Sequence, residues 1–246
     1  MRIEPINKYF PELNKASSIC DVGCGSGIYL AALQKLGYSY LYGIEFNFDS
    51  VELINHNFNF KKVIQGEIRQ SNDIPKVDLI TAFDVLEHIP NPKETIREIY
   101  QMLNDETGYL HIRVPNYGSL WAKLFRRKWL WMIPPFHLNY FDYKSLKILA
   151  ENNGFEIIKL RSRRSGFRIA FWFLQSKKLL KKNIDSFDSS SYSKNNFFII
   201  NSIELLLRFL YFPIYIVVQL FDADDCLELY AKKKKPMERL KTVDNS

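Results

Sequence analysis

The chain has 246 residues, of which 34 are lysine or arginine and 27 aspartate or glutamate, so its formal net charge is +7. With 47% hydrophobic and 15% aromatic residues it can bury a sizeable core, which excludes a mainly disordered protein. Cys20, Cys24 and Cys226 are too few for a secreted disulfide scaffold, and their spacing matches no paired-cysteine zinc site. The first residues also lack the apolar stretch of an export signal. We therefore expect a cytoplasmic protein.

Short apolar or β-branched runs alternate with helical patterns over the first 165 residues. The predicted strands are Ser18–Val22, Tyr40–Glu45, Lys62–Gln65, Val77–Phe83, Tyr109–Val114 and Glu156–Leu160, and a last one follows at Cys226–Ala231. The predicted helices are Ile28–Leu36, stopped by Gly37, Lys93–Leu103, started by Pro92, and one from Asp142 to about Asn152. This alternation is typical of βα units that assemble into a parallel sheet.

A glycine-rich loop closes the first predicted strand and opens the first predicted helix. Gly23, Gly25 and Gly27 allow the backbone to turn sharply and to lie against a ligand. Eighteen residues later, Glu45 ends the second strand, where its carboxylate can accept hydrogen bonds from ribose hydroxyls. A dinucleotide fingerprint would need its third glycine at the position of Ile28. The spacing thus favours a nucleoside ligand other than NAD.

These motifs resemble those of class I S-adenosylmethionine-dependent methyltransferases, in particular the group related to ubiquinone-biosynthesis O-methyltransferases. The resemblance is carried by the loop at residues 21–27, by Tyr42-Gly43-Ile44-Glu45-Phe46 and by residues 77–89, which end in Leu86-Glu87-His88-Ile89. Residues 136–141 and 153–156 look similar as well. The resemblance implies an α/β fold: a Rossmann-like, doubly wound, seven-stranded sheet, mostly parallel, with an antiparallel last strand and a helical insert before it.

The resemblance also implies the cofactor, S-adenosylmethionine, and the residues that hold it. The glycines would approach its methionine part, Asp21 would fix the loop and the amino group, and Glu45 would hold the ribose. Phe46 would lie against adenine, with Glu67 and Ile68 at the adenine edge, and Phe83 and Asp84 would line the floor near the sulfonium. The full set of expected cofactor contacts is Asp21, Gly23, Cys24, Gly25, Gly27, Glu45, Phe46, Glu67, Ile68, Phe83 and Asp84.

Two histidines are candidate general bases, because imidazole titrates near neutral pH and an acceptor hydroxyl must lose a proton. His88 follows the fourth strand, and His137 precedes the helix that begins after Asp142. Asp84, Glu87 and His88 resemble a cluster with which relatives that methylate catechols can hold a divalent cation. One oxygen-rich half-site does not predict a metal centre, so we assign no metal ligand.

The sequence divides into a cofactor-binding core at residues 1–165, a hydrophobic insert at 166–222, and a last strand with a polar, basic tail at 223–246. Residues 113–182 hold 16 basic and 3 acidic groups, which would attract anions. Three roles are open for the insert. It could be a lid over a lipid-like or aromatic acceptor, a peripheral contact with the inner face of the membrane, or an extra core or dimer interface.

The run Arg126-Arg127-Lys128 with Trp129 and Trp131 mixes cations and aromatics, as RNA-binding grooves do. An RNA methyltransferase is therefore an alternative, but the chain shows no RNA-binding appendage or base-methylation motif, so we expect no nucleic-acid partner. A methyltransferase-like protein that binds without catalysing is the other alternative. The function we predict is O-methylation of a small or lipid-linked acceptor; the acceptor and the oligomeric state are left open.

Overall fold

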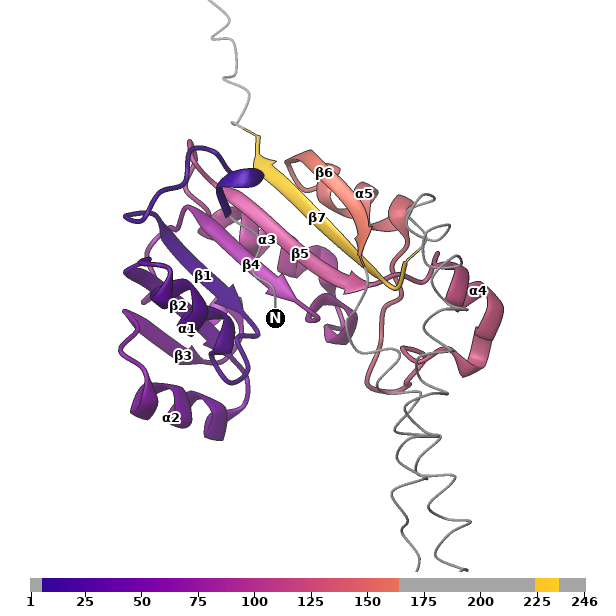
Figure 1. Ribbon diagram of the computed structural model, residues 1–246, viewed down its shortest axis with the longest axis horizontal. Coiled ribbons are helices and arrows are strands. Elements are labelled where there is room, and N and C mark those ends of the chain that lie inside the picture. The colour runs from indigo at the N-terminus through magenta and orange to yellow at the C-terminus, as the bar shows by residue number, and fades with distance from the viewer. Residues whose placement is uncertain (1–5, 164–223, 235–246) are drawn as a thin grey trace, which may run out of the picture.

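The computed structural model describes residues 6–163 and 224–234 (Figure 1). The predicted insert, residues 166–222, and most of the tail lie outside the described residues. The chain begins with a 3-10 turn, η1 (Ile6–Lys8), before the first strand. The seven strands are β1 (Ser18–Val22), β2 (Tyr40–Glu45), β3 (Lys62–Gln65), β4 (Leu79–Phe83), β5 (Tyr109–Pro115), β6 (Phe155–Arg163) and β7 (Cys226–Lys233).

The strands form one sheet in the order β3-β2-β1-β4-β5-β7-β6. The pairs from β3 to β5 are parallel, whereas β7 runs antiparallel to both β5 and β6. The chain order therefore reverses between β1 and β4, and ligands of open α/β sheets bind at the carboxyl ends of the strands beside such a switch point. The expected Rossmann-like, mostly parallel sheet with an antiparallel last strand is confirmed.

The helices connect the strands and begin at recognisable caps. The described helices and 3-10 turns that follow β1 are α1 (Ile28–Lys35), α2 (Phe48–Asn57), η2 (Ile68–Gln70), η3 (Leu86–His88), α3 (Pro92–Met102), α4 (Leu120–Phe125), η4 (Arg126–Lys128) and α5 (Tyr143–Glu151). Asn47 and Asp142 cap α2 and α5 by accepting hydrogen bonds from Ser50 N and Ser145 N, and Pro92 occupies the first position of α3.

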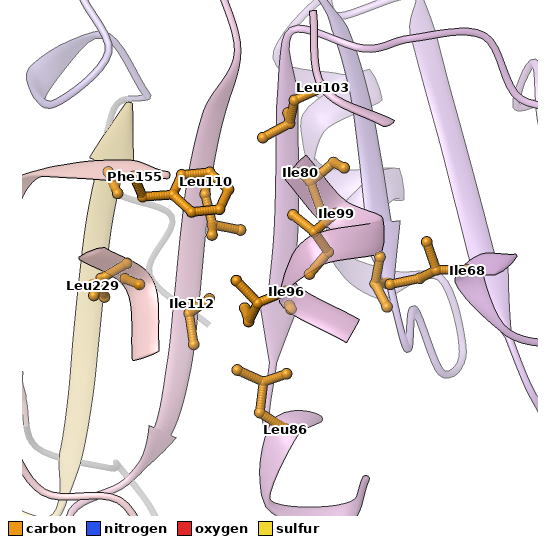
Figure 2. Packing of buried hydrophobic residues seen from close by; sticks show 14 of the residues in the cluster. Ile68, Ile80, Leu86, Ile96, Ile99, Leu103, Leu110, Ile112, Phe155 and Leu229 are labelled. Atoms are coloured by element: carbon orange, nitrogen blue, oxygen red, sulfur yellow. The ribbon is translucent and has the colours of Figure 1, made fainter. Parts of the chain in front are cut away.

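Two hydrophobic clusters cover the two faces of the sheet, because successive strand residues point to opposite faces. Ile19 of β1 belongs to the cluster with α1 and α2, whereas its neighbour Cys20 belongs to the cluster with α3 and α5. Figure 2 shows the second cluster, in which Ile96 and Ile99 of α3 lie against the sheet. Burial on both faces fixes the sheet and holds the strand ends in place.

Four strands differ from their predicted bounds, β5 and β7 only in that they extend to Pro115 and Lys233. β4 begins at Leu79 rather than Val77, because Asp78 is held by side-chain hydrogen bonds from Asn104 and Thr107 at 2.7 and 2.6 Å, and Val77 forms only an isolated bridge. β6 extends to Arg163 because it pairs with β7 along nearly its whole length. A helix long and apolar enough to cross a membrane does not occur among the described residues.

Candidate active site

The glycine loop after β1 lies at the carboxyl edge of the sheet. Gly23, Gly25 and Gly27 all have positive φ, a conformation that side chains disfavour. The amides of Gly23 and Cys24 donate to the carbonyl of Ile44 at 2.8 and 3.2 Å, which ties the loop to β2. A Cβ at Gly23 would lie 2.5 Å from the Val85 side chain, whereas a Cβ at Gly25 would meet no atom within 4 Å. The loop is thus packed on one side and open at Gly25.

Glu45, the last residue of β2, connects this loop to the next helix. Its Oε2 accepts a hydrogen bond from the amide of Gly25 at 2.8 Å, and its Oε1 accepts one from the amide of Asn47 at 2.9 Å. Each carboxylate oxygen has a second acceptor site. Glu45 can therefore hold the loop and still accept hydrogen bonds from two ligand hydroxyls.

Asp21 lies beneath the loop and is 4% exposed. Thr81 of the neighbouring β4 donates its hydroxyl to Asp21 Oδ1 at 2.5 Å. Burial raises the pKa of Asp21 to about 7, against the opposing effects of the Thr81 hydrogen bond and the Arg113 charge. A nearby ammonium group would lower the pKa of this carboxyl and so favour its charged form.

The remaining residues expected around the cofactor differ in their exposure and in their local partners. Phe46 is 75% exposed immediately after β2, and Phe83 is half-buried at the end of β4. Ile68 is buried, while Glu67 caps η2 and pairs with Arg69 at 2.8 Å, so its carboxylate is engaged locally. The Cys24 side chain is buried beside Gly43, where a Cβ would lie 2.9 Å from its sulfur. Only the backbone of Cys24 is left for a ligand.

Arg113 is a site residue that the sequence did not reveal. It projects from β5 beside Phe83, with its guanidinium carbon 5.1 Å from the ring centroid. Its guanidinium donates to both carboxylate oxygens of Asp84, and the Asp84 amide donates to the Arg113 carbonyl at 2.9 Å. These bonds hold Asp84 at φ +58, a rare conformation for a residue other than glycine. Its place in the sequence, as a charged residue near the carboxyl end of a mostly apolar strand, could have pointed to it.

The two candidate histidines meet although 49 positions separate them. The ring centroids of His88 and His137 lie 4.7 Å apart, nearly perpendicular. Two backbone amides, Leu138 N and Asn139 N, donate to the Glu87 carbonyl at 2.7 and 3.0 Å and so fix the His137 loop against η3. This contact joins residues that follow β4 to residues that follow β5.

Backbone contacts fix one nitrogen of each ring. His88 Nδ1 lies 2.8 Å from the Phe136 carbonyl, which can only accept, so this nitrogen carries a proton. His137 hydrogen-bonds the backbone of Trp131, while its Nδ1 is buried without a hydrogen-bond partner. Burial and the nearby His88 lower the pKa of His137, so its ring is neutral at neutral pH with a free lone pair on Nδ1.

Glu87 completes the cluster. Its side chain is 2% exposed, its Oε1 lies 4.0 Å from His88 Nε2, and its Oε2 has no hydrogen-bond partner. Burial and the negative charge of Asp84 raise the pKa of Glu87 to about 8, although one backbone hydrogen bond and Arg113 act against this. One donor atom from each of Glu87, His88 and His137 lies within 4.8 Å of the others, a set that could also hold a metal ion.

Replacing Glu87 with glutamine should stabilise the protein at neutral and mildly alkaline pH. The folded-state pKa of about 8 lies above the ordinary value of 4.5, so the protonated carboxyl stabilises the fold fully below pH 4.5. Between pH 4.5 and 8 the unfolded chain has released this proton while the folded chain still binds it. The contribution therefore falls over this range and is lost once the pH has risen through 8. At pH 7 to 8 the variant should gain about 1–3 kcal/mol in free energy of unfolding, measured by urea denaturation. A gain that does not change between pH 5 and 8 would contradict this account.

A family model described as a methyltransferase domain matches residues 3–160. Two ubiquinone biosynthesis O-methyltransferases are similar over part of the chain. The mitochondrial protein of Saccharomyces cerevisiae is 30% identical over 105 residues, which are 40% of this chain and 34% of that protein. The protein of Glaesserella parasuis is 31% identical over 108 residues, which are 40% and 45% of the two chains. The matched region is thus less than half the length of either relative.

Solved structures share the fold. A SAM-dependent methyltransferase from Archaeoglobus fulgidus has a TM-score of 0.56 and 20% identity over 92% of this chain and 91% of that one. One from Methanosarcina mazei has a TM-score of 0.59 and 17% identity over 96% and 100% of the two chains. A third is the [4+2]-cyclase SpnF, with a TM-score of 0.59 and 16% identity over 94% and 78% of the two chains.

The site fits the cofactor that this family uses. The loop is open at Gly25, where an added Cβ would meet no protein atom within 4 Å, and the Glu45 carboxylate binds the Gly25 amide while the buried Asp21 carboxyl precedes the loop near the end of β1. Glu45 would hold the ribose, Asp21 the amino group, and the loop amides the methionine part. The chain belongs to the methyltransferase-domain family, its fold is that of S-adenosylmethionine-dependent methyltransferases, and these residues fit S-adenosylmethionine as the cofactor.

Proposed function

We propose that the protein methylates a hydroxyl oxygen of a small or lipid-linked acceptor. The observation that carries this proposal is the buried, unpartnered Nδ1 of His137 beside His88, near the carboxyl end of β4. The bound cofactor supplies an electrophilic methyl group, so the chain itself has to orient the acceptor and take up its proton. A neutral imidazole with a free lone pair suits the second task.

His137 is the better placed of the two candidate bases. Its proton-accepting nitrogen is buried and free, and the backbone of Trp131 holds the other side of the ring. The His88 side chain is 46% exposed, and its Nδ1 contacts the Phe136 carbonyl. We infer that His137 accepts the hydroxyl proton and that His88 orients the His137 ring and the acceptor.

The distant similarity to ubiquinone biosynthesis O-methyltransferases supports oxygen as the acceptor atom. The family assignment favours catalysis over a merely binding role, and it is silent on RNA. We place the protein in the cytoplasm, where its three free cysteines stay reduced, with peripheral contact to the inner face of the membrane.

The test is turnover. Purified protein, S-adenosylmethionine and panels of phenolic, glycan and lipid-linked hydroxyl compounds should yield S-adenosylhomocysteine and an acceptor heavier by one methylene unit, both detected by mass spectrometry. Because the proposed reaction needs a base and no metal, we expect the same rate after treatment with EDTA. A rate that falls and is restored by a divalent cation would assign a metal to the Glu87–His88–His137 cluster. Binding of the cofactor without turnover on any panel would favour the non-catalytic alternative.

A further inference from the structure

We propose that α4 and η4 form a docking face for an anionic lipid bilayer. The docking face is residues 120–128, from Leu120 at the start of α4 to Lys128 at the end of η4. It lies outside the cofactor and histidine sites described above. The charges and exposed side chains of this face would attract a bilayer whether or not the histidines carry out the reaction proposed above.

The docking face is basic without compensating acids. Between Glu106 and Asp142 the sequence has five lysines and arginines and no aspartate or glutamate. Four of the five, Lys123, Arg126, Arg127 and Lys128, belong to the docking face. All four are exposed, and none forms an ion pair with a described residue. Such a group of cations attracts an anionic surface.

Large apolar side chains share this exposed surface. Leu120, Leu124 and Phe125 are 42%, 63% and 45% exposed, whereas Ala122 of the same helix is buried. A helix on the surface of a soluble protein normally turns polar residues outward and apolar residues inward. Here the outward side of α4 carries both apolar and basic side chains, the combination by which interfacial helices bind membranes.

The environment of the aromatic residues distinguishes a bilayer from RNA. Single-stranded RNA stacks its bases on open aromatic faces. Trp129 is 4% exposed, and Trp121 stacks on Phe125 with the two rings 6.0 Å apart and 11° from parallel. The side chain most open beside the cations is the aliphatic Leu124, at 63% exposed, and Trp121 covers one face of the Phe125 ring. Aliphatic groups enter the acyl boundary of a bilayer but offer no stacking surface to a base.

The docking face also lies at the edge of the sheet where the strands have their carboxyl ends. Figure 1 shows α4 beyond the carboxyl end of β5, the end at which Arg113 approaches Asp84. The chain that leaves the docking face reaches Phe136, which is 71% exposed and whose carbonyl contacts His88. A bilayer held on this face would therefore lie on the side of the molecule that carries the histidine cluster.

The proposal is tested by vesicle flotation with the full chain. Vesicles of phosphatidylcholine with about 30% phosphatidylglycerol should bind the protein at low salt, and pure phosphatidylcholine vesicles should bind it much less. The variant Arg126→Gln/Arg127→Gln/Lys128→Gln should reduce the partition coefficient at least about tenfold, because each cation contributes to attraction by the anionic surface. Leu124→Ser should weaken binding severalfold and change its salt dependence little, because it removes an apolar contact.

Matched variants control for charge and hydrophobicity. Lys35→Gln/Lys93→Gln/Lys144→Gln removes three exposed cations elsewhere, and Leu53→Ser removes a leucine that is 55% exposed on α2. Both should bind vesicles like the unmodified protein. Equal loss in the control and docking-face triple variants would overturn the proposal, as would unchanged binding of the docking-face variants.

Two other partners give distinct results. If RNA rather than lipid were the ligand, a fluorescent single-stranded RNA would bind with steep salt dependence, the docking-face triple variant would lose this binding, and vesicles would stay unbound. If a second copy covered the face, Leu124→Ser would convert a dimer to a monomer in light scattering without any vesicle binding. Either result would overturn the proposal. Cofactor affinity, measured in parallel, should be the same in all variants.

Discussion

Replacing Gly25 with valine should weaken binding of S-adenosylmethionine and S-adenosylhomocysteine at least about 100-fold while leaving the fold intact. The new Cβ would meet no protein atom within 4 Å, so the side chain enters the space in which the cofactor has to lie. The backbone at φ +53 adds strain of about 1–2 kcal/mol, a small loss for a domain of this size. Titration calorimetry measures the affinity, and thermal unfolding measures the stability.

Gly37→Val is the matched control for this experiment. Gly37 also has positive φ, at +92, and its Cβ would meet only the Lys15 side chain at 3.8 Å. It ends α1 at the opposite end from the loop. This variant should lose a similar amount of stability and keep its cofactor affinity. If both valine variants bound the cofactor equally well, the loop at Gly25 would not be the cofactor site.

Glu45→Ala extends the same test to the second strand. It removes the acceptor of both the Gly25 and the Asn47 amide, so the loop loses one of its links to β2 as well as the proposed contact with the ribose. We expect an affinity loss on the order of 100-fold, corresponding to two charge-assisted hydrogen bonds. Glu45→Gln keeps one acceptor oxygen and should lose less. Equal losses in the two variants would argue against a role of the carboxylate in ribose binding.

His137→Gln should lower kcat about 10²- to 10⁴-fold, the range that a positioned general base contributes. Cofactor affinity should stay within about threefold of the unmodified value, because the glycine loop and Glu45 are untouched. The readout is S-adenosylhomocysteine formation with any acceptor that supports turnover. His56→Gln, an exposed histidine in the last turn of α2, is the matched control and should retain full activity.

The pH profile gives an independent readout of the same base. Because burial and His88 lower the pKa of His137, its ring stays neutral to below the usual pH of about 6.5. The profile of kcat/KM should therefore be flat around neutral pH and fall on the acidic side, with its midpoint below that value. His88→Gln should reduce kcat less than His137→Gln does and keep an acid limb. A larger loss in the His88 variant would make His88 the base instead.

The glycine turn after β1 could be predicted from the sequence because its determinants are local. Three glycines within five positions, directly after a buried strand, require the sharp turn that the structure contains, and all three have positive φ. The helix limits are local as well. Asp142 caps α5 through Ser145 only three residues away, and Pro92 begins α3 without needing any distant partner.

Contacts between distant segments could not be predicted in this way. Arg113 and Asp84 are brought together only because β4 and β5 pair in one register, with Phe83 opposite Arg113. The local role of Glu67 was also missed. Glu67 caps η2, and Gln70 completes a capping box with it. The helix α4 was not predicted either, since its outward side is apolar and basic rather than polar.

The sequence by itself determined the alternation of strands and helices and the glycine turn. These features depend on hydrophobic periodicity and on backbone conformations that a few neighbouring residues impose. Only the tertiary structure decided that the His137 ring lies against His88 and that Nδ1 of His137 is left buried and free. Burial and the approach of two loops from different strands lower the pKa of His137 and raise that of Glu87, and neither effect can be read from spacing along the chain.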